Sequence, residues 1–247
     1  RVTQSLTKCI LTDYRRDKCK NCSDLCSHRI AFHGLNGNGG RTASANIPKD
    51  YRYITLKTSP AREGQTKIYE MLDKYVATFK RHISGGERAK SLYLWSESPG
   101  TGKTTTASAL LNAWLASEYL YAMQTGGQPP QTSAYFLDVT ELQTQYNLAA
   151  MTKDEAGLTE IGAIIKRTQT ASFAILDDIG TRSSTEAFTA YIHAVVNYRT
   201  ANGLPTIYTS NLPITEMEQI FDARIYDRMR DQCAVIHFEG ESKRGRR

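Results

Sequence analysis

A glycine-rich stretch, SESPGTGKTT at residues 96–105, carries the side chains best suited to hold phosphate. Glycines let the backbone approach a phosphate closely, and the N–H groups at the start of a helix attract anions. Lys103 could reach the terminal phosphates of a nucleotide, and the Thr104 hydroxyl could ligate Mg²⁺. The residues predicted to line this site are Pro99, Gly100, Thr101, Gly102, Lys103, Thr104 and Thr105. Glu97 occupies the first glycine position of the motif G-x-x-x-x-G-K-[ST], so the loop departs from the motif there.

Two adjacent carboxylates, Asp177 and Asp178, follow the apolar run Phe173–Leu176. Carboxylates at the end of a buried strand cost free energy unless a cation or water uses them. Ligands of parallel sheets bind at that edge, so we expect Asp177 to support Mg²⁺ and Asp178 to orient an attacking water. Asn211 follows another predicted strand and could hydrogen-bond the γ-phosphate or its water. An asparagine in this position is also a common helix cap.

Four of the five cysteines, Cys9, Cys19, Cys22 and Cys26, lie near the N-terminus, and the last three have the spacing C-x2-C-x3-C. Clustered cysteines in a cytosolic protein favour a metal over disulfides. Four thiolates around Zn²⁺ would fold a segment that is poor in apolar residues. His28 and His33 are alternative ligands, and a reduced N-terminus without metal is the remaining interpretation.

Composition limits the class of protein less sharply than these motifs do. The 247 residues are 40% hydrophobic and carry a formal net charge of +6, which mildly favours an anionic partner such as nucleic acid. The first residues are polar and basic and lack the apolar core of a signal peptide. The longest apolar-rich run, 107–123, contains polar residues and reads as a buried helix. We therefore expect a cytoplasmic protein without membrane contact.

The elements that must position these residues alternate between strands and helices. This alternation predicts an α/β fold with a parallel sheet covered by helices on both faces. The expected strands are 91–95, 133–137, 173–176, 206–209 and 234–238. The expected helices are 65–83, 103 onward, 140–151, 158–169, 184–202, 214–221 and 223–231. The glycine-rich stretch 33–52 reads as a linker or an extended arm.

The chain resembles the AAA+ ATPases, and within them the DnaC/DnaI helicase-loader group, which also includes the IstB transposition helpers. The resemblance rests on PGTGKTTTASAL, FAILDDIG, YRTANGLPTIYTSN and ARIYDRMRDQCAVIHFEGESKRGR, which together span roughly residues 91–246. It implies that Asp178 replaces the usual glutamate, which suggests slow, switch-like hydrolysis. It also implies that Asn211 is the polar sensor and that Arg228, with Arg224 as the second candidate, is the arginine finger. Arg244 would be the second sensor arginine.

The expected organisation is a zinc-binding module and linker at 1–46, which docks the helicase, followed by an AAA+ domain at 47–247. The nine residues after Phe238 leave no room for a C-terminal helical lid. The resemblance implies ATP-dependent loading of a hexameric replicative DNA helicase onto single-stranded DNA. ATP, Mg²⁺ and Zn²⁺ would be the cofactors. ATP binding would drive self-association through the nucleotide site, and hydrolysis would drive release.

Three alternatives remain open at this point. The first is an IstB-like transposition helper ATPase that acts on target DNA, the second is a P-loop kinase of small molecules, and the third is an adaptor that uses ATP only for assembly. Arg228 could instead pair with Asp227 or Asp231 on the surface. The candidate contacts to single-stranded DNA are Lys153, Lys166 and Arg167, although the last two also suit the C-terminal end of a helix dipole.

Overall fold

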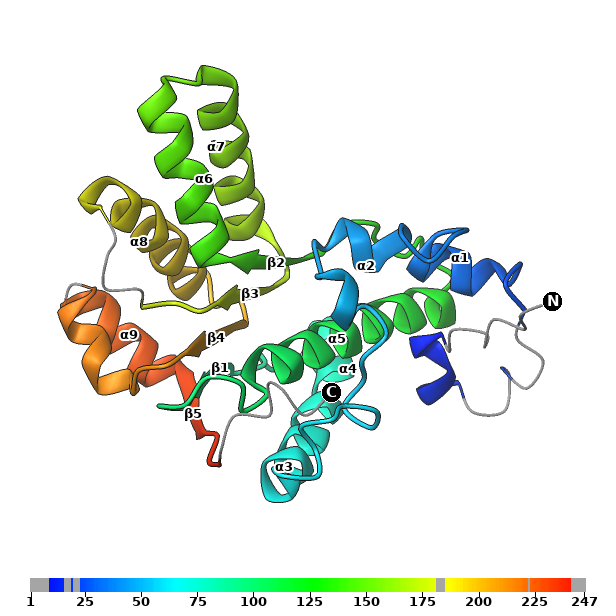
Figure 1. Cartoon of the computed structure of the whole chain (residues 1–247). Helices are drawn as coiled ribbons and strands as arrows, with labels where there is room; N and C mark the ends of the chain where they lie inside the picture. Colours follow the sequence, from blue (N-terminus) through cyan, green and yellow to red (C-terminus); the bar gives the residue numbers. More distant parts are fainter. Residues whose placement is uncertain (1–8, 16–18, 20–22, 181–184, 222, 241–247) are drawn as a thin grey trace.

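The computed structural model describes residues 9–15, 19, 23–180, 185–221 and 223–240. Its centre is a five-stranded, all-parallel sheet with the strand order β2-β3-β4-β1-β5. The strands are β1 (Ser91–Trp95), β2 (Ala134–Asp138), β3 (Phe173–Asp177), β4 (Thr206–Ser210) and β5 (Cys233–His237) (Figure 1). The predicted α/β fold is confirmed, and each expected strand is present to within one residue at either end.

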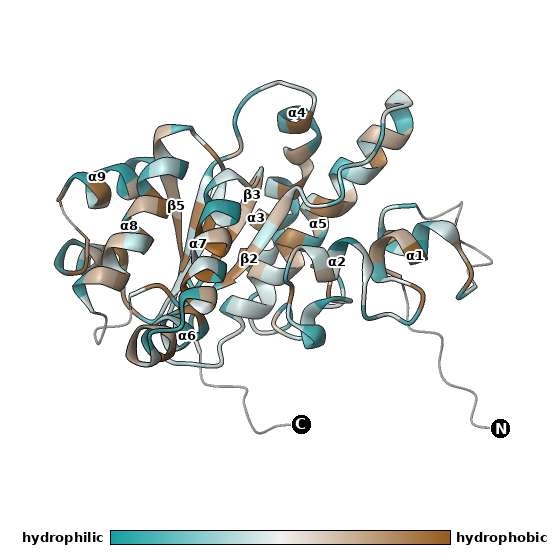
Figure 2. Ribbon diagram, turned by 90° about the horizontal axis from the view of Figure 1, so that it is seen from above, coloured by the Kyte–Doolittle hydropathy of each residue, from teal (hydrophilic) through white to brown (hydrophobic). Residues whose placement is uncertain are grey.

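Helices cover both faces of the sheet. One face carries α3 (Thr66–Ala77), α4 (Phe79–Ile83) and α5 (Lys103–Thr125) (Figure 1). The opposite face carries α6 (Val139–Thr152), α7 (Glu155–Thr170), α8 (Glu186–Ala201) and α9 (Ala223–Gln232). Alternate strand residues enter one or the other of the two resulting cores, because successive side chains of a strand point to opposite faces. The central strands are therefore buried on both sides, and Figure 2 shows brown, hydrophobic residues among them.

The long helix α5 is buried along most of its length, as expected for the helix that follows a phosphate loop. Its polar residue Asn112 donates from Nδ2 to the carbonyls of Tyr51 (2.9 Å) and Ile54 (2.8 Å), whereas its buried Oδ1 has no hydrogen-bond partner among the described residues. No helix within the described ranges has both the length and the apolar character that a membrane span requires.

The glycine-rich stretch 33–52 does not form an extended arm, so that prediction was wrong. It contains α2 (Gly40–Ser44) and the 3₁₀ helix η2 (Lys49–Tyr51), and it runs beside the outer edge of β2. There the Phe136 N–H donates to the Ala45 carbonyl (2.8 Å), and Asn46 Nδ2 donates to the Phe136 carbonyl (3.0 Å). Gly40 has a φ of 66°, and a Cβ at this position would collide with the backbone of Phe32. The glycine marks close packing, and this packing protects a sheet edge.

The N-terminal residues share the core beneath α5. The 3₁₀ helix η1 (Ile10–Asp13) and helix α1 (Ser27–His33) bring Ile10, Leu11 and Phe32 into the same buried cluster as α5 and the sheet. Hydrophobic contact is thus continuous across residue 46, where the sequence predicts a boundary between two domains. That boundary stays a prediction.

Two expected helices differ in detail from the structure. The predicted helix 65–83 breaks at Thr78 into α3 and α4, where the Thr78 hydroxyl donates to the Tyr75 carbonyl (2.7 Å) and competes with regular helix bonding. The helical spacing of Ile68, Met71, Leu72, Tyr75, Val76 and Phe79 predicts that all six face the core, but Met71 is 45% exposed. The predicted helix 214–221 is the 3₁₀ helix η3 (Ile214–Gln219).

Candidate nucleotide site

The loop between β1 and α5 has the backbone that a phosphate cradle needs. Gly100 and Gly102 have φ values of 79° and 102°, a region that only glycine enters readily. A Cβ on Gly102 would also collide with the Cβ of Ala61. Positive φ among described residues other than glycine occurs at Asn46, Lys153 and Asp178. Glu97 therefore has an ordinary backbone and an exposed side chain, which explains how the loop accommodates it in place of glycine.

Lys103 begins α5 and is only 8% exposed. Its Nζ donates to Ser96 Oγ (2.7 Å) and to Asn211 Oδ1 (2.8 Å). The fold thus brings the loop lysine against the amide that follows β4, 108 residues away. Ser96 also donates to the Ser98 carbonyl (2.6 Å) and lies 2.8 Å from Thr101 Oγ1. The sequence analysis missed Ser96, although its place at the first position after β1 was a signal.

Asp177, at the end of β3, is 6% exposed and accepts two hydrogen bonds. Thr104 Oγ1 donates to Oδ2 (3.0 Å), and Thr209 Oγ1 donates to Oδ1 (2.6 Å). Burial raises the pKa of Asp177 to about 6, and the two threonine hydrogen bonds only partly oppose this rise. A buried carboxylate and a hydroxyl side by side are hard oxygen ligands, and a cation between them would offset the cost of burial. Thr104 and Asp177 therefore fit Mg²⁺.

Asp178 has a φ of 58°, which turns the chain sharply after β3 and leaves its carboxylate at the surface. Its N–H donates to Thr209 Oγ1 (2.8 Å). Its two carboxylate oxygens accept longer hydrogen bonds of 3.4 Å from Asn211 Nδ2 and Thr140 Oγ1. Thr209 thus contacts both aspartates through one hydroxyl. Sequence reasoning missed Thr209 and Thr140, because a threonine in a strand or at a helix start has many ordinary roles.

The two arginine-finger candidates lie on α9, with Arg224 and Arg228 both exposed. Arg228 Nη1 donates to Asn197 Oδ1 of α8, so Arg228 contacts an amide and not a carboxylate there. Asp227, one of the two acids considered as a surface partner, instead pairs with Arg230 at 3.0 Å. The role of either arginine as a finger stays a prediction. Arg244 lies outside the described residues.

The predicted zinc ligands are only partly described, because Cys22 falls outside the described residues. Cys9 and Cys26 both lie close enough to Tyr119 to raise its pKa, although burial is the larger cause. His28 Nδ1 is 2.7 Å from Tyr119 Oη, so this alternative ligand lies in the same neighbourhood. Among the described residues no group of three or more histidines, cysteines and acids is arranged to hold a metal. The four-cysteine site stays a prediction.

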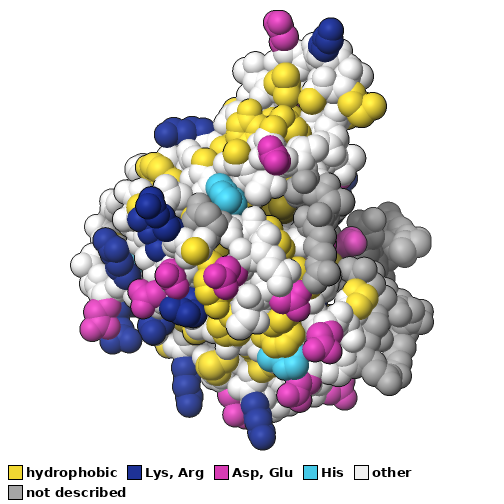
Figure 3. Space-filling model, turned by 90° about the vertical axis from the view of Figure 1, so that its left-hand side faces the viewer, with side chains coloured by type: hydrophobic (Ala, Val, Ile, Leu, Met, Phe, Trp, Pro, Cys, Tyr) yellow, Lys and Arg dark blue, Asp and Glu magenta, His cyan; other side chains and the backbone are white. Residues whose placement is uncertain are grey.

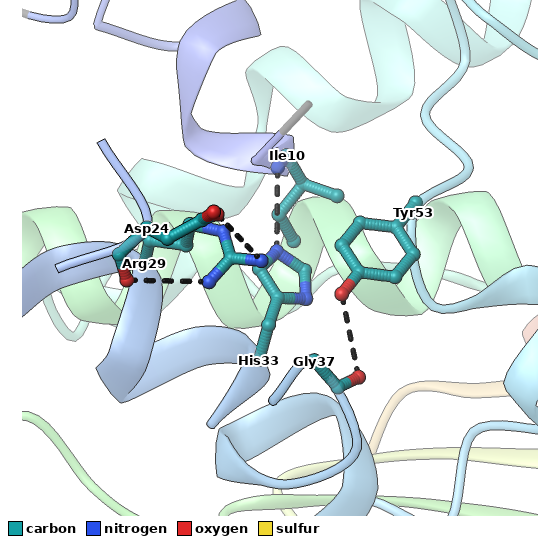
Figure 4. Close-up of polar contacts among 6 residues, drawn as sticks. All are labelled: Ile10, Asp24, Arg29, His33, Gly37 and Tyr53. Atoms are coloured by element: carbon teal, nitrogen blue, oxygen red, sulfur yellow. Dashed lines mark hydrogen bonds and ion pairs between the residues drawn. The ribbon is translucent and has the colours of Figure 1, made fainter. Parts of the chain in front are cut away.

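His33, the other alternative ligand, has a structural role. It is fully buried, its Nε2 accepts the N–H of Ile10 (3.4 Å), and its ring stacks on Tyr53 at 4.3 Å (Figure 4). Burial, with Arg29 and Arg52 nearby, lowers the pKa of His33 to about 4. The neutral ring therefore fastens the N-terminal segment to α1 near neutral pH.

The three candidate DNA contacts do not form one patch. Lys153 caps α6 at the tip of the projecting α6–α7 hairpin, whereas Lys166 and Arg167 lie in the last turns of α7 (Figure 1). Lys166 lies over the ring of Tyr198 at 5.6 Å. Arg167 lies over Tyr135 at 4.7 Å and donates to the Ser44 carbonyl, so it is held within the fold. Figure 3 shows the projecting end with charges of both signs above a hydrophobic area.

Arg199 of α8 is a buried cation that the sequence analysis did not single out. It is fully buried and donates only to oxygens of the protein: Thr206 Oγ1 and the carbonyls of Thr168, Gln169, Ala171 and Pro205. Burial lowers its pKa to about 10. Arg199 joins the end of α7 to the start of β4, and it thereby supports the strand that delivers Thr209 and Asn211.

Comparison with known proteins gives distant but consistent matches, although no family model matches the chain. A curated replicative helicase loader DnaC from Buchnera aphidicola subsp. Schizaphis graminum is 24% identical over 183 residues, which are 74% of this chain and 65% of that protein. The chain thus spans slightly less than two thirds of the length of the curated relatives it matches.

Two solved structures share the fold. A DnaC helicase loader matches with a TM-score of 0.56 and 19% identity, covering 78% of this chain and all of that chain. DnaI matches with a TM-score of 0.54 and 21% identity, covering 78% of this chain and 95% of that chain. The chain is therefore similar in sequence to curated DnaC replicative helicase loaders and shares the fold of the DnaC and DnaI structures.

Proposed function

We propose that the chain is an ATP-dependent loader of a replicative DNA helicase. It binds ATP to assemble with other copies, places a hexameric helicase on single-stranded DNA, and hydrolyses ATP to release it. The observation that carries this proposal is the convergence of the loop lysine, a threonine, two carboxylates and an amide at one edge of the sheet. The curated relatives named as replicative helicase loaders support the choice of partner.

Nucleotide binding begins, in this proposal, with an exchange of partners at Lys103. Its ammonium group now donates to Ser96 and Asn211, and phosphate oxygens would take the place of these acceptors. This exchange releases the Asn211 side chain, which already contacts Asp178 and can then report on the terminal phosphate. The loop N–H groups and the start of α5 add fixed positive dipoles.

The two aspartates divide the work. Asp177 and Thr104 hold Mg²⁺, which supplies neutralisation of phosphate charge when it is bound. Asp178 accepts a proton from the attacking water and orients it. Its shorter side chain reaches less far than a glutamate would, which supports slow, switch-like hydrolysis. Thr209 fixes the relation between the two carboxylates, because it contacts both residues.

Arg228 completes the site of a neighbouring copy. A lone subunit has Lys103 at the phosphates but needs a further cation for the charge that develops during phosphoryl transfer. A guanidinium suits that role because it stays charged and offers a planar fork of donors. Its exposure on α9 supports action in trans, and Arg224 is the second candidate. Arg244 would act as a further sensor of the nucleotide.

The N-terminal segment 1–46 docks the helicase in this proposal, with Zn²⁺ held by Cys9, Cys19, Cys22 and Cys26. The shared neighbourhood of Cys9 and Cys26 around Tyr119 supports it. Metal analysis of protein purified without chelators should give about one zinc per chain. The Cys22→Ser variant should lose the metal and helicase binding while it still binds ATP. A chain that binds helicase normally without zinc would move docking elsewhere.

Contact with single-stranded DNA rests mainly on the positive net charge and on Lys153 and Lys166, since Arg167 is held within the fold. Each phosphate contact on a single strand should add about 0.7 to the slope of log affinity against log salt. Binding that does not change with salt would exclude contacts of this kind.

The decisive experiment is a loading assay on circular single-stranded DNA, which offers no end for a closed ring to thread. Full chain, ATP and a candidate helicase are mixed, and helicase bound to the circle is measured. We expect loading with the parent chain, loss with Lys103→Ala, and normal loading with Lys67→Ala, an exposed lysine on α3. Absence of loading, together with co-purification of a transposase, would favour the transposition-helper alternative.

A further inference from the structure

A cavity of about 220 Å³ lies between α3 and the strands β1 and β5. It is on the face of the sheet opposite the α6–α7 hairpin. Leu72, Leu92 and Ile236 form part of its lining, and each is almost fully buried. Met71, 45% exposed, lies at its mouth and has an adaptable side chain. The volume is below the roughly 300–1,000 Å³ of cofactor and drug sites, so it suits one or two side chains of a protein.

The wall of this cavity is held in place without a ligand. The segment Glu87–Lys90 forms one side, and it is tied to α3 and α4 by two hydrogen bonds. Tyr75 Oη donates to the Lys90 carbonyl (2.5 Å), and the Ala89 N–H donates to His82 Nδ1 (3.0 Å). A preformed cavity binds a side chain with less loss of conformational freedom than one that must first assemble.

The rim of the cavity is positively charged. Arg81, Arg88 and Lys90 stand around it with one acid, Glu87, and all four side chains are exposed. Within the described part of the chain these three cations form no ion pair. The last seven residues of the sequence, ESKRGRR, are themselves basic, so they do not match this rim in charge. The complementary occupant is acidic around an apolar centre.

The cavity adjoins an open edge of the sheet. β5 is the last strand in the order, and no described strand pairs with its outer edge. Ala234 and Ile236 of β5 both line the cavity, since alternate residues of a strand face the same side. An extended segment added to β5 would point its own alternate side chains into the same space. This is the geometry by which sheet edges capture peptides.

We propose that this cavity docks an extended, acidic segment of a partner protein. One large apolar side chain fills the space between α3 and β5, and flanking carboxylates meet Arg81, Arg88 and Lys90. Single-stranded nucleic acid fits less well, because its bases need exposed aromatic faces on which to stack. The single aromatic residue in the lining is Tyr75, and its hydroxyl already donates to the Lys90 carbonyl. The proposal concerns a surface apart from the nucleotide site and does not depend on ATP hydrolysis.

The test uses random short peptides displayed on phage and selected against the full chain, followed by Kd measurements on the most enriched peptide. We expect the selected peptides to share one large apolar residue flanked by Asp or Glu. Ala234→Phe, which fills the cavity, should raise Kd by about tenfold. The double variant Arg81→Glu/Lys90→Glu should do the same, and added salt should weaken the parent complex.

The matched control is Lys67→Glu/Lys74→Glu, which makes the same change in charge on the exposed side of α3 and should leave Kd unchanged. Circular dichroism and ATP binding verify the fold, and if Ala234→Phe does not fold, the charge variants carry the test. Selected peptides that share no pattern or are basic would overturn the proposal. A peptide Kd that is unchanged in Arg81→Glu/Lys90→Glu would also overturn it. So would displacement of the bound peptide by a poly(dT) oligonucleotide.

Discussion

Replacing Asp177 by Asn should stabilise the metal-free protein while it removes Mg²⁺ binding. The carboxylate of Asp177 is 6% exposed, and its pKa rises from 3.8 to about 6 on folding, chiefly through burial. The folded chain therefore binds this proton more tightly than the unfolded chain does. Asn has nearly the same shape but no charge: its Oδ1 can accept from Thr209, and its Nδ2 can donate to Thr104 Oγ1, which rotates its hydroxyl to become the acceptor.

The magnitude follows from the difference between the two pKa values. Each unit corresponds to about 1.4 kcal/mol, so burying the ionised Asp177 costs roughly 3 kcal/mol of folding free energy at pH 7. Below the unfolded pKa the carboxyl is protonated in both states and the cost disappears. The stability of the parent chain relative to Asp177→Asn should therefore fall as pH rises from about 4 to about 6, and then level off.

Urea unfolding of both proteins with EDTA at pH 4 and pH 7 measures this difference. We expect similar unfolding free energies at pH 4 and an advantage of about 3 kcal/mol for Asp177→Asn at pH 7. Mg²⁺ with an ATP analogue should stabilise only the parent chain. Asp178→Asn is the matched control and should change stability little, because Asp178 is exposed. The account of Asp177 would be refuted if Asp177→Asn were less stable than the parent chain at pH 7, or if its unfolding free energy differed from that of the parent by the same amount at pH 4 and pH 7.

Three further predictions concern other parts of the site. Thr209→Val should lower stability by roughly 2–4 kcal/mol and raise the Mg²⁺ concentration needed for ATP hydrolysis, because Asp177 and the Asp178 N–H both lose a hydrogen-bond partner. Thr209→Ser keeps the hydroxyl and should restore both properties, and normal hydrolysis by the Val variant would exclude a role of Thr209 in placing the two aspartates. Arg228→Ala should bind ATP normally but hydrolyse it about 10³-fold or more slowly, and mixing it with Lys103→Ala subunits should restore activity; unchanged hydrolysis would assign the finger elsewhere. Arg199→Lys should lose about 3 kcal/mol in urea unfolding, because one ammonium cannot serve the five acceptors of the guanidinium; stability equal to the parent would show that these bonds contribute little.

The cavity beside β5 could not be predicted from the sequence. Its lining combines α3, α4, the segment 87–90 and two strands, and each of these reads alone as ordinary core or surface. Helical periodicity predicts that Met71 is buried with the other apolar residues of α3, because periodicity averages over a whole helix. The break at Thr78 and the position of α3 over the sheet decide which of these apolar side chains are covered.

The sequence alone determined the parts of the site that are local in the chain. A strand, a glycine loop and a helix start follow one another at residues 91–105, and their backbone preferences act over a few residues, so Lys103 and Thr104 could be placed without knowledge of the fold. The apolar run before Asp177 likewise located the two carboxylates at a strand end. Fully buried strands that alternate with helices also fixed the α/β parallel class.

Only the tertiary structure decided which residues meet across the sheet. Asn211 reaches Lys103, and Thr209 joins both aspartates, because β4 lies between β3 and β1 in a strand order that the chain order does not state. Arg199 could not be recognised as buried, since its five acceptors come from two segments, 168–171 and 205–206, that only the fold brings together. The sequence of 33–52 predicts a linker or an extended arm because glycine is common in such segments, but glycine also permits the tightest packing, and only the neighbouring residues distinguish the two.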